Sequence, residues 1–156
     1  MLTIDTARTV PVQEDLTTDE TRLQILRGLE HMFRVDKPLA AATALVLGEW
    51  GVLNSDGKME RPGATGVPNT YLVFAGTERF DVVATGKVTL VFGSHIVAST
   101  SQFDTGPHYE VGDPLTAKTL GHGEAILTAA TDPADAILAR VVEFVDGKLT
   151  FETIRN

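Results

Sequence analysis

The chain has 156 residues, of which 43% are hydrophobic and 22% charged, a composition that is typical of a globular domain and excludes wholesale disorder. Its formal net charge is −8 and it contains no cysteine, so we expect no nucleic-acid surface, and disulfides, thiolate metal sites and cysteine nucleophiles are excluded. The longest uncharged apolar stretch, residues 39–47, is far shorter than the ~20 residues that a membrane-spanning helix needs, so we expect no membrane partner.

Residues 1–15 are predicted to form an extended N-terminal arm. The segment is polar, lacks the pattern of a secretory signal, and carries the spaced apolar residues Leu2, Ile4, Val10 and Val12, with Pro11 between the last two. Such an arm either stays loose or adds a strand to the edge of another sheet, where its main chain gains hydrogen bonds. Both alternatives are open from the residues alone, and the second would make these five residues a contact with another chain.

Residues 18–34 are predicted to form one amphipathic helix. Thr17 and Glu20 fit a capping box, and apolar residues follow at three- and four-residue steps, namely Leu23, Leu26, Leu29, Met32 and Phe33. Pro38 prevents the helix from continuing. We expect the apolar stripe to pack on the sheet of the same chain; the alternative is that it docks on a partner chain.

Glycine and proline are rare up to residue 35 and frequent beyond it, which divides the chain into an arm with a helix (residues 1–35) and a β-rich domain (residues 36–156). The second part predicts eight to ten short strands joined by tight turns, an arrangement typical of a β-sandwich or barrel. The strand-like runs are residues 43–53, 70–76, 80–83, 87–104, 113–120, 123–130 and 136–154, the last being a hairpin that turns at Asp146 and Gly147.

Motifs for catalysis are lacking in this sequence. The histidines are His31, His95, His108 and His122, far apart and without a ligand spacing, and no nucleophile, phosphate-loop or dinucleotide motif occurs. His122 lies between two glycines, which a short turn explains as well as a catalytic base does. We therefore expect no enzyme and no cofactor.

Residues 104–113 contain three carboxylates and a histidine, and oxygen ligands on a flexible loop are what Ca²⁺ prefers. The spacing matches no EF-hand, and two turns account for the glycines and prolines, so a solvated loop is the favoured interpretation and no metal site is predicted. Trp50 is the single tryptophan, and packing in the core or at its rim is favoured over ligand stacking.

Two pieces of the β-rich part carry a resemblance to a known class of proteins. Residues 109–115 read YEVGDPL, and residues 136–154 form a hairpin with the rhythm A-x-V…DG-x-L-x-F. Together with the succession of strand-like runs and turns over residues 44–154, they look like the capsid decoration (cement) proteins of tailed bacteriophages, which are small, all-β structural proteins. The predicted helix over residues 18–34 departs from that pattern.

This resemblance implies a β-tulip-like domain that binds the outer surface of an icosahedral capsid and bridges neighbouring major capsid proteins. It further implies a homotrimer on the virion exterior, synthesised in the host cytoplasm, with no catalytic residues. On this resemblance we expect residues 1–15 to reach a neighbouring subunit, with the contact made by Leu2, Ile4, Val10, Pro11 and Val12. Two alternatives remain open. One is a phage tail-tube or baseplate protein, and the other is a small-ligand or carbohydrate-binding β module in which Trp50 and Tyr71 form a stacking platform.

Overall fold

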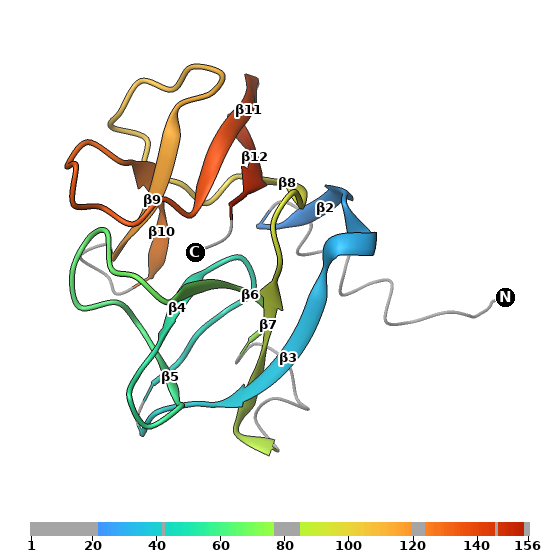
Figure 1. The fold of residues 1–156 in the computed structure, drawn as a ribbon, viewed down its shortest axis with the longest axis vertical. Coiled ribbons are helices and arrows are strands. Elements are labelled where there is room, and N and C mark those ends of the chain that lie inside the picture. The colour runs from blue at the N-terminus through green and yellow to red at the C-terminus, as the bar shows by residue number, and fades with distance from the viewer. Residues whose placement is uncertain (1–21, 42, 77–84, 120–123, 146, 155–156) are drawn as a thin grey trace, which may run out of the picture.

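The computed structural model describes residues 22–41, 43–76, 85–119, 124–145 and 147–154 (Figure 1). The chain is mainly β and forms two antiparallel sheets, which confirms the predicted fold class at that level. Within the described residues no helix is long and apolar enough to cross a membrane.

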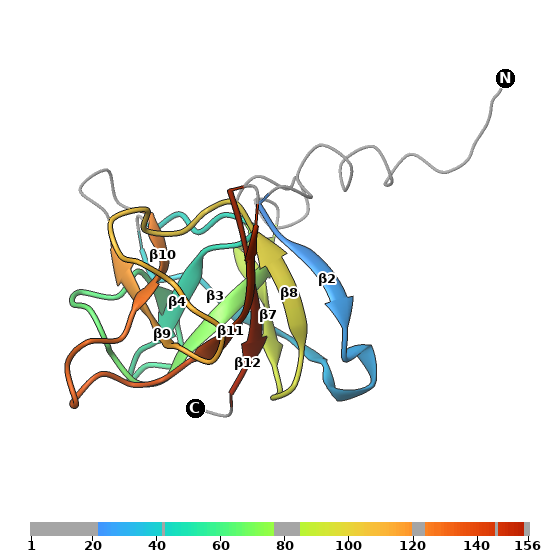
Figure 2. The ribbon, with the colours of Figure 1, turned by 90° about the horizontal axis from the view of Figure 1, so that it is seen from above.

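The first sheet has six strands in the order β10–β9–β11–β12–β8–β2, and the adjacent strands β12, β8 and β2 are easily followed from above (Figure 2). Its strands are β2 (Gln24–Arg27), β8 (Val97–Thr100), β9 (Pro114–Thr119), β10 (Ala125–Ala129), β11 (Ala139–Val145) and β12 (Lys148–Thr153). A parallel bridge between Phe103 and Leu127 joins the end beyond β8 to β10, so the sheet curls toward itself.

The second sheet has five strands in the order β3–β7–β6–β4–β5. Its strands are β3 (Phe33–Pro38), β4 (Trp50–Leu53), β5 (Met59–Glu60), β6 (Thr70–Ala75) and β7 (Lys87–Phe92). Here too a parallel bridge, between Leu39 and Met59, brings the two edges together.

Alternating side chains of the central strands build two apolar cores. On β7, Val88 and Leu90 are fully buried inside the curl of the five-stranded sheet, whereas Val91 points to the core between the two sheets. In that second core Trp50 of β4 packs on Phe151 of β12, with ring centroids 6.0 Å apart. The expected core packing of Trp50 is therefore confirmed.

The predicted helix over residues 18–34 is wrong for its described part, residues 22–34. These residues form β2, a 3₁₀ turn η1 (Leu29–His31) and the start of β3. The physical reason is tertiary, because β8 and β7 supply main-chain partners to β2 and β3 that local helix propensity cannot reveal. The predicted boundary at residue 36 falls within β3, and residues 1–21 lie outside the described residues.

Beyond residue 43, each predicted strand-like run that can be compared contains a strand, but residues 43–49 of the predicted run 43–53 form a loop and turn, and only β4 is extended there. Residues 136–154 contain the predicted hairpin, in which β11 and β12 pair from Ala139–Thr153 to Val145–Lys148. The expected short strand at residues 80–83 lies outside the described residues. The long run from residue 87 is divided into β7 and β8 by the turn at residues 93–96.

Candidate interaction surfaces

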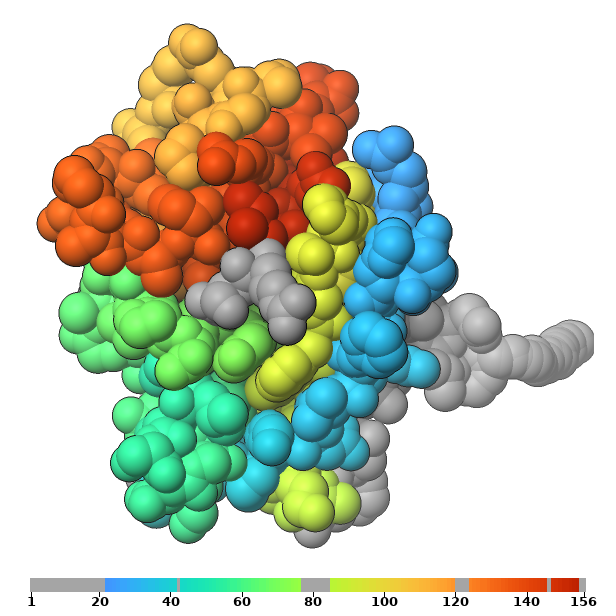
Figure 3. Space-filling view, in the orientation of Figure 1, coloured from blue at the N-terminus to red at the C-terminus, as the bar shows by residue number. Residues whose placement is uncertain are grey.

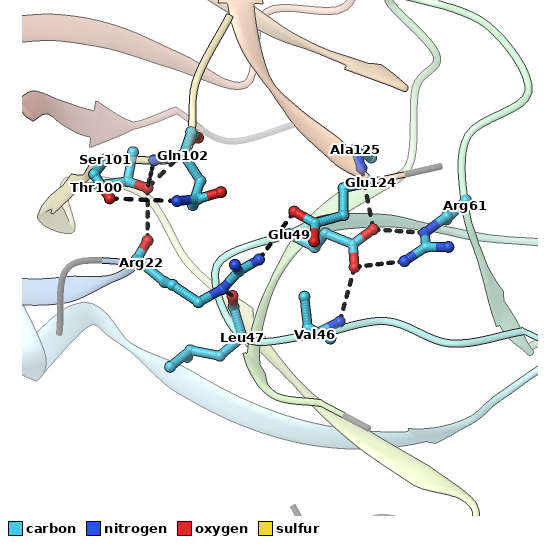
Figure 4. Close-up of polar contacts among 10 residues, drawn as sticks. All are labelled: Arg22, Val46, Leu47, Glu49, Arg61, Thr100, Ser101, Gln102, Glu124 and Ala125. Atoms are coloured by element: carbon cyan, nitrogen blue, oxygen red, sulfur yellow. Dashed lines mark hydrogen bonds and ion pairs between the residues drawn. The ribbon is translucent and has the colours of Figure 1, made fainter. Parts of the chain in front are cut away.

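Arg22, where residues 1–21 join the described body, is bound to both sheets (Figure 4). Its Nε donates to the carbonyl of Leu47, just before β4, at 2.9 Å, and its Nη2 pairs with Glu124, just before β10, at 3.0 Å. Its own carbonyl accepts a hydrogen bond of 2.6 Å from the hydroxyl of Thr100 at the end of β8. Gly48 has a φ of +85°, and a Cβ there would lie 2.7 Å from the carbonyl of Arg22, so only glycine permits this approach.

A second polar contact between the two sheets is centred on Glu49. The carboxylate of Glu49 is fully buried and accepts hydrogen bonds from the guanidinium of Arg61, from the Val46 N–H at 2.8 Å and from the Ala125 N–H at 3.0 Å. Its hydrogen bond with Glu49 raises the pKa of Arg61 above its usual value, although burial opposes this. Because Glu49 lies before β4 and Ala125 begins β10, the satisfied carboxylate fixes one sheet on the other.

The segment that was predicted as helix exposes three large apolar side chains. Leu26, Leu29 and Phe33 are 47%, 65% and 66% exposed, and we call them the edge patch. Among the described residues, β2 and β3 each pair on one side only, so this segment forms an edge of both sheets. An exposed sheet edge with apolar side chains is a surface on which another chain can dock.

The turn within the edge patch is fixed against its neighbours. Gly28 has a φ of +91°, and a Cβ there would collide with the carbonyl of His95. The rings of His31 and His95 lie 6.1 Å apart, edge to face. The edge patch is therefore presented by a closely packed turn.

Beside the edge patch lies a pocket of about 570 Å³. Its aromatic lining is Phe33, Trp50, Tyr71 and Phe92, and its polar lining includes Glu30, His31, Ser94 and Thr153. The rings of Tyr71 and Phe92 stack with centroids 4.3 Å apart and planes within 5° of parallel. Trp50 is only 4% exposed, so most of its ring belongs to the core, and one face of Tyr71 is covered by Phe92.

A second group of exposed apolar side chains lies at the tip of the β11–β12 hairpin and on the loop before β9. Val111, Phe144 and Val145 are 77%, 44% and 50% exposed, and we call them the tip patch. Phe144 stands edge to face on the rings of Phe103 and Tyr109, at 5.5 and 5.8 Å. This aromatic contact holds the loop on the hairpin.

Hydrogen bonds that Asp104 accepts close the same loop. Burial disfavours its charge, but the Gly106 N–H, the Thr128 hydroxyl and the Lys118 ammonium hold the pKa of Asp104 below its usual value. The Tyr109 hydroxyl donates to the carbonyl of Asp104. Burial, with the nearby Asp104 charge, raises the pKa of Tyr109 to about 12.

The arm residues that were predicted to contact a neighbouring subunit cannot be compared with the structure. Leu2, Ile4, Val10, Pro11 and Val12 lie outside the described residues. The same holds for His122.

The carboxylates of residues 104–113 do not converge. Glu110 pairs with His108 at 3.0 Å, whereas Asp104 faces Lys118 and Thr128. In the described part of the chain no group of three or more histidine, aspartate or glutamate side chains is placed to hold a metal ion.

No protein-family model, curated protein or solved structure matches the chain. Sequence reasoning assigned the edge patch to the apolar stripe of a helix, for which docking on a partner chain was the alternative. The tip patch was missed, because it joins residues of the hairpin and of the loop before β9 that only the three-dimensional structure brings together.

Proposed function

We propose that this chain is a structural protein of a bacteriophage virion that binds the outer surface of the capsid and holds neighbouring major capsid subunits together. Residues 1–15 supply its contact, through Leu2, Ile4, Val10, Pro11 and Val12. The proposal is supported by the resemblance of residues 109–115 and 136–154 to capsid decoration proteins and by the mainly β body with two sheets.

The observation that carries the proposal furthest is the anchoring of Arg22. If residues 1–15 link the protein to a neighbouring subunit, they can stabilise the shell only when the body does not unfold locally at the point where they join it. At Arg22 the side chain holds Leu47 and Glu124 and the main chain holds Thr100, so a load arriving from residues 1–21 is shared by both sheets. The buried Glu49 carboxylate then passes the load from β4 to β10.

Stabilisation of the shell would come from added interface. A standard protein interface buries about 1,600 Å², and its strength depends on its anchor residues more than on its area. Many copies on one shell, associated with one another as homotrimers, multiply the effect through avidity. A net charge of −8 keeps such a protein soluble and away from nucleic acid.

Co-sedimentation with expanded capsids that lack this protein, prepared from the phage that encodes it, tests the proposal. The variant carries serine in place of Leu2, Ile4, Val10 and Val12. The matched control carries alanine in place of Thr3, Thr6 and Thr9 of the same segment. The proposal predicts saturating binding by the natural chain and the control and loss of binding by the serine variant. Equal binding by all three would refute the role of the arm, and binding by none, with tubes or rings formed by the protein alone, would favour a tail protein.

One observation favours a second candidate, a ligand-binding β module. Trp50 and Tyr71, far apart in the sequence, line the same pocket with Phe92. A glycan array with the natural chain and with Tyr71→Ala tests it. Binding that the substitution abolishes would support a carbohydrate site, whereas negligible binding by both proteins would remove it.

A further inference from the structure

We propose that the pocket beside the edge patch binds an organic cation of the quaternary ammonium class, that is, a positively charged nitrogen that carries methyl or longer alkyl groups. Such a cation would occupy the pocket of the ligand-binding candidate, and the proposal rests on that candidate only in this respect. A cation site is a different class of site from a carbohydrate site, and it is independent of capsid attachment through residues 1–15.

The pocket lies where the two sheets meet. Trp50 of β4, Tyr71 of β6 and Phe92 of β7 line it from the five-stranded sheet, and Thr153 of β12 lines it from the six-stranded sheet. Its volume of about 570 Å³ falls within the range of roughly 300–1,000 Å³ in which proteins bind small molecules. The pocket therefore has room for a cation with an organic body.

Two turns that fit closely together, η1 and the turn after β7, form one wall of the pocket through Glu30, His31 and Ser94. Gly93 has a φ of +131°, and a Cβ there would collide with the carbonyl of His31. Figure 3 shows the two segments side by side, with η1 and the start of β3 in blue and the segment after β7 in yellow. Because the rings of His31 and His95 also pack edge to face, this wall is formed before a ligand arrives, which lowers the ordering cost of binding.

Aromatic side chains supply much of the remaining lining, namely Phe33, Trp50, Tyr71 and Phe92. Phe33 is 66% exposed and Tyr71 and Phe92 are half-buried, whereas Trp50 is almost completely buried. The electrons above an aromatic ring attract a cation, and the attraction grows when water is excluded. Several rings around one pocket are the arrangement with which proteins recognise quaternary ammonium groups.

Glu30 gives the pocket its charge. Among the described residues that line the pocket it is the one acidic side chain, and none of them is a lysine or an arginine. No described residue donates a hydrogen bond to the Glu30 carboxylate or forms an ion pair with it, and the side chain is exposed. An unpaired carboxylate beside aromatic rings favours a positively charged ligand over a neutral or a negative one.

Arg34, which follows Phe33 in β3, does not neutralise Glu30 in the pocket. The guanidinium carbon of Arg34 lies 5.6 Å from the centre of the Phe74 ring. Neither Arg34 nor Phe74 lines the pocket, since neighbouring residues of a strand point to opposite faces of the sheet. The carboxylate of Glu30 therefore faces the pocket without this arginine.

Two further charged residues flank the lining at the end of β12. Glu152 is paired with His95 at 3.1 Å. Arg155 follows the lining residue Ile154 and lies outside the described residues. The variant Arg155→Gln therefore accompanies the natural chain in the test below.

The polar part of the lining favours an alkylated cation over a sugar or a bare metal ion. The hydroxyl of Thr70 donates to the carbonyl of Val67, and that of Thr153 donates to the carbonyl of Gly93, so neither hydroxyl is left to donate to a sugar. In the described part of the chain no group of three or more histidine, aspartate or glutamate side chains could hold a metal ion. A nitrogen that carries only alkyl groups has no hydrogen to donate, so aromatic rings and one carboxylate are sufficient partners for it.

Isothermal titration calorimetry of the full chain with choline, at about pH 8 to keep histidine side chains neutral, tests the site. The uncharged analogue dimethylbutanol, in which a carbon atom replaces the nitrogen, has the same shape and is titrated in parallel. We expect choline to bind about 10-fold or more tightly than this analogue. Equal affinities, or no binding of choline by the natural chain, would overturn the proposal.

Three variants assign the binding to this pocket. Glu30→Gln should weaken choline binding about 3-fold by removing the charge, and Phe33→Leu should weaken it about 3-fold by replacing a ring with an apolar side chain. Neither substitution should change the affinity for the uncharged analogue. Glu143→Gln, the same change at an exposed position of β11 outside the pocket, is the matched control and should leave both affinities unchanged. Equal effects of the two glutamate variants would contradict the assignment.

Two comparisons identify the occupant. Phosphocholine should bind more weakly than choline because Glu30 repels its phosphate, whereas tighter binding would point to a lipid headgroup and contradict the role of Glu30. Arg155→Gln should bind choline as the natural chain does, and binding by this variant alone would mean that the chain supplies the cation itself, which would overturn the proposal. Because neither capsids nor glycans are present, failure of these titrations leaves the capsid and carbohydrate proposals untouched, and failure of those leaves the cation site untouched.

Discussion

The guanidinium of Arg61 donates two hydrogen bonds, of 2.7 and 3.0 Å, to the carboxylate of Glu49, whose side chain has no exposed surface. Two main-chain N–H groups, from Val46 and Ala125, occupy the remaining acceptor positions. A buried ion pair with this many partners is satisfied as a unit, so removing one member leaves the other uncompensated.

Arg61→Met should therefore destabilise the protein by about 3 kcal/mol, the lower part of the range for breaking a buried pair, since Arg61 is itself partly exposed. Chemical denaturation measures the loss. Arg140→Met, which removes an exposed guanidinium, is the control and should change stability by less than about 0.5 kcal/mol. Adding Glu49→Gln to Arg61→Met should recover part of the loss because the unpaired charge is gone. Equal effects of the two arginine variants would contradict this account of Glu49.

Gly28→Ala should destabilise the turn that carries the edge patch. At a φ of +91° an alanine is strained, and its Cβ would also meet the carbonyl of His95. Gly57 has a φ of +75° with open space around it, so Gly57→Ala isolates the conformational cost of about 1–2 kcal/mol. Denaturation should show a clearly larger loss for Gly28→Ala. Equal losses would mean that the turn yields to the added methyl group.

Tyr109 should titrate well above an ordinary tyrosine. In a Tyr71→Phe variant it is the remaining tyrosine, and the ultraviolet absorbance of tyrosinate should report a midpoint near pH 12 in the folded protein. A pKa that folding raises from 10 to about 12 contributes stability that is complete below pH 10 and is lost as the pH rises toward 12. Asp104→Asn should lower the midpoint because the nearby charge is removed. A midpoint near 10 in the folded protein would contradict the buried geometry.

Arg22→Met should loosen the point where residues 1–21 join the body. It loses the hydrogen bond to Leu47 and the ion pair with Glu124, while the main-chain contact with Thr100 is kept. Because the side chain is partly exposed, we expect a modest loss of about 1–2 kcal/mol. Hydrogen exchange should become faster for amides near Leu47 and β10 and not for β7. An equal increase in exchange rate for amides of β7, β10 and the region of Leu47 would show that Arg22 is not a local anchor.

The alternation of apolar residues was enough to predict much of the β-rich part. The pattern of residues 136–154 predicts the β11–β12 hairpin because side chains on a strand alternate between faces and Gly147 suits the turn. The tip patch was not predictable in this way. The register shifts between Val141 and Glu143, and this bulge changes which face Phe144 occupies.

For residues 22–34 the apolar pattern predicted the wrong secondary structure. Leu23, Leu26 and Leu29 fit a helical repeat, yet Leu23 is buried in the core between the sheets and the other two are exposed. Pairing of β2 with β8 and of β3 with β7 decides the structure, and those partners are 49 residues or more away in the sequence, the nearest being Pro38 and Lys87. The edge patch and the contacts of Arg22 likewise depend on the three-dimensional arrangement.

The central claim is that the protein strengthens a capsid, and DNA release from filled capsids on heating tests it most directly. Capsids that lack the protein are heated alone and after addition of the natural chain at saturation, and released DNA is followed by the fluorescence of an intercalating dye. We predict that the temperature of release rises with occupancy and returns to that of bare capsids with the serine variant of residues 1–15. An unchanged release temperature at full occupancy would contradict the claim.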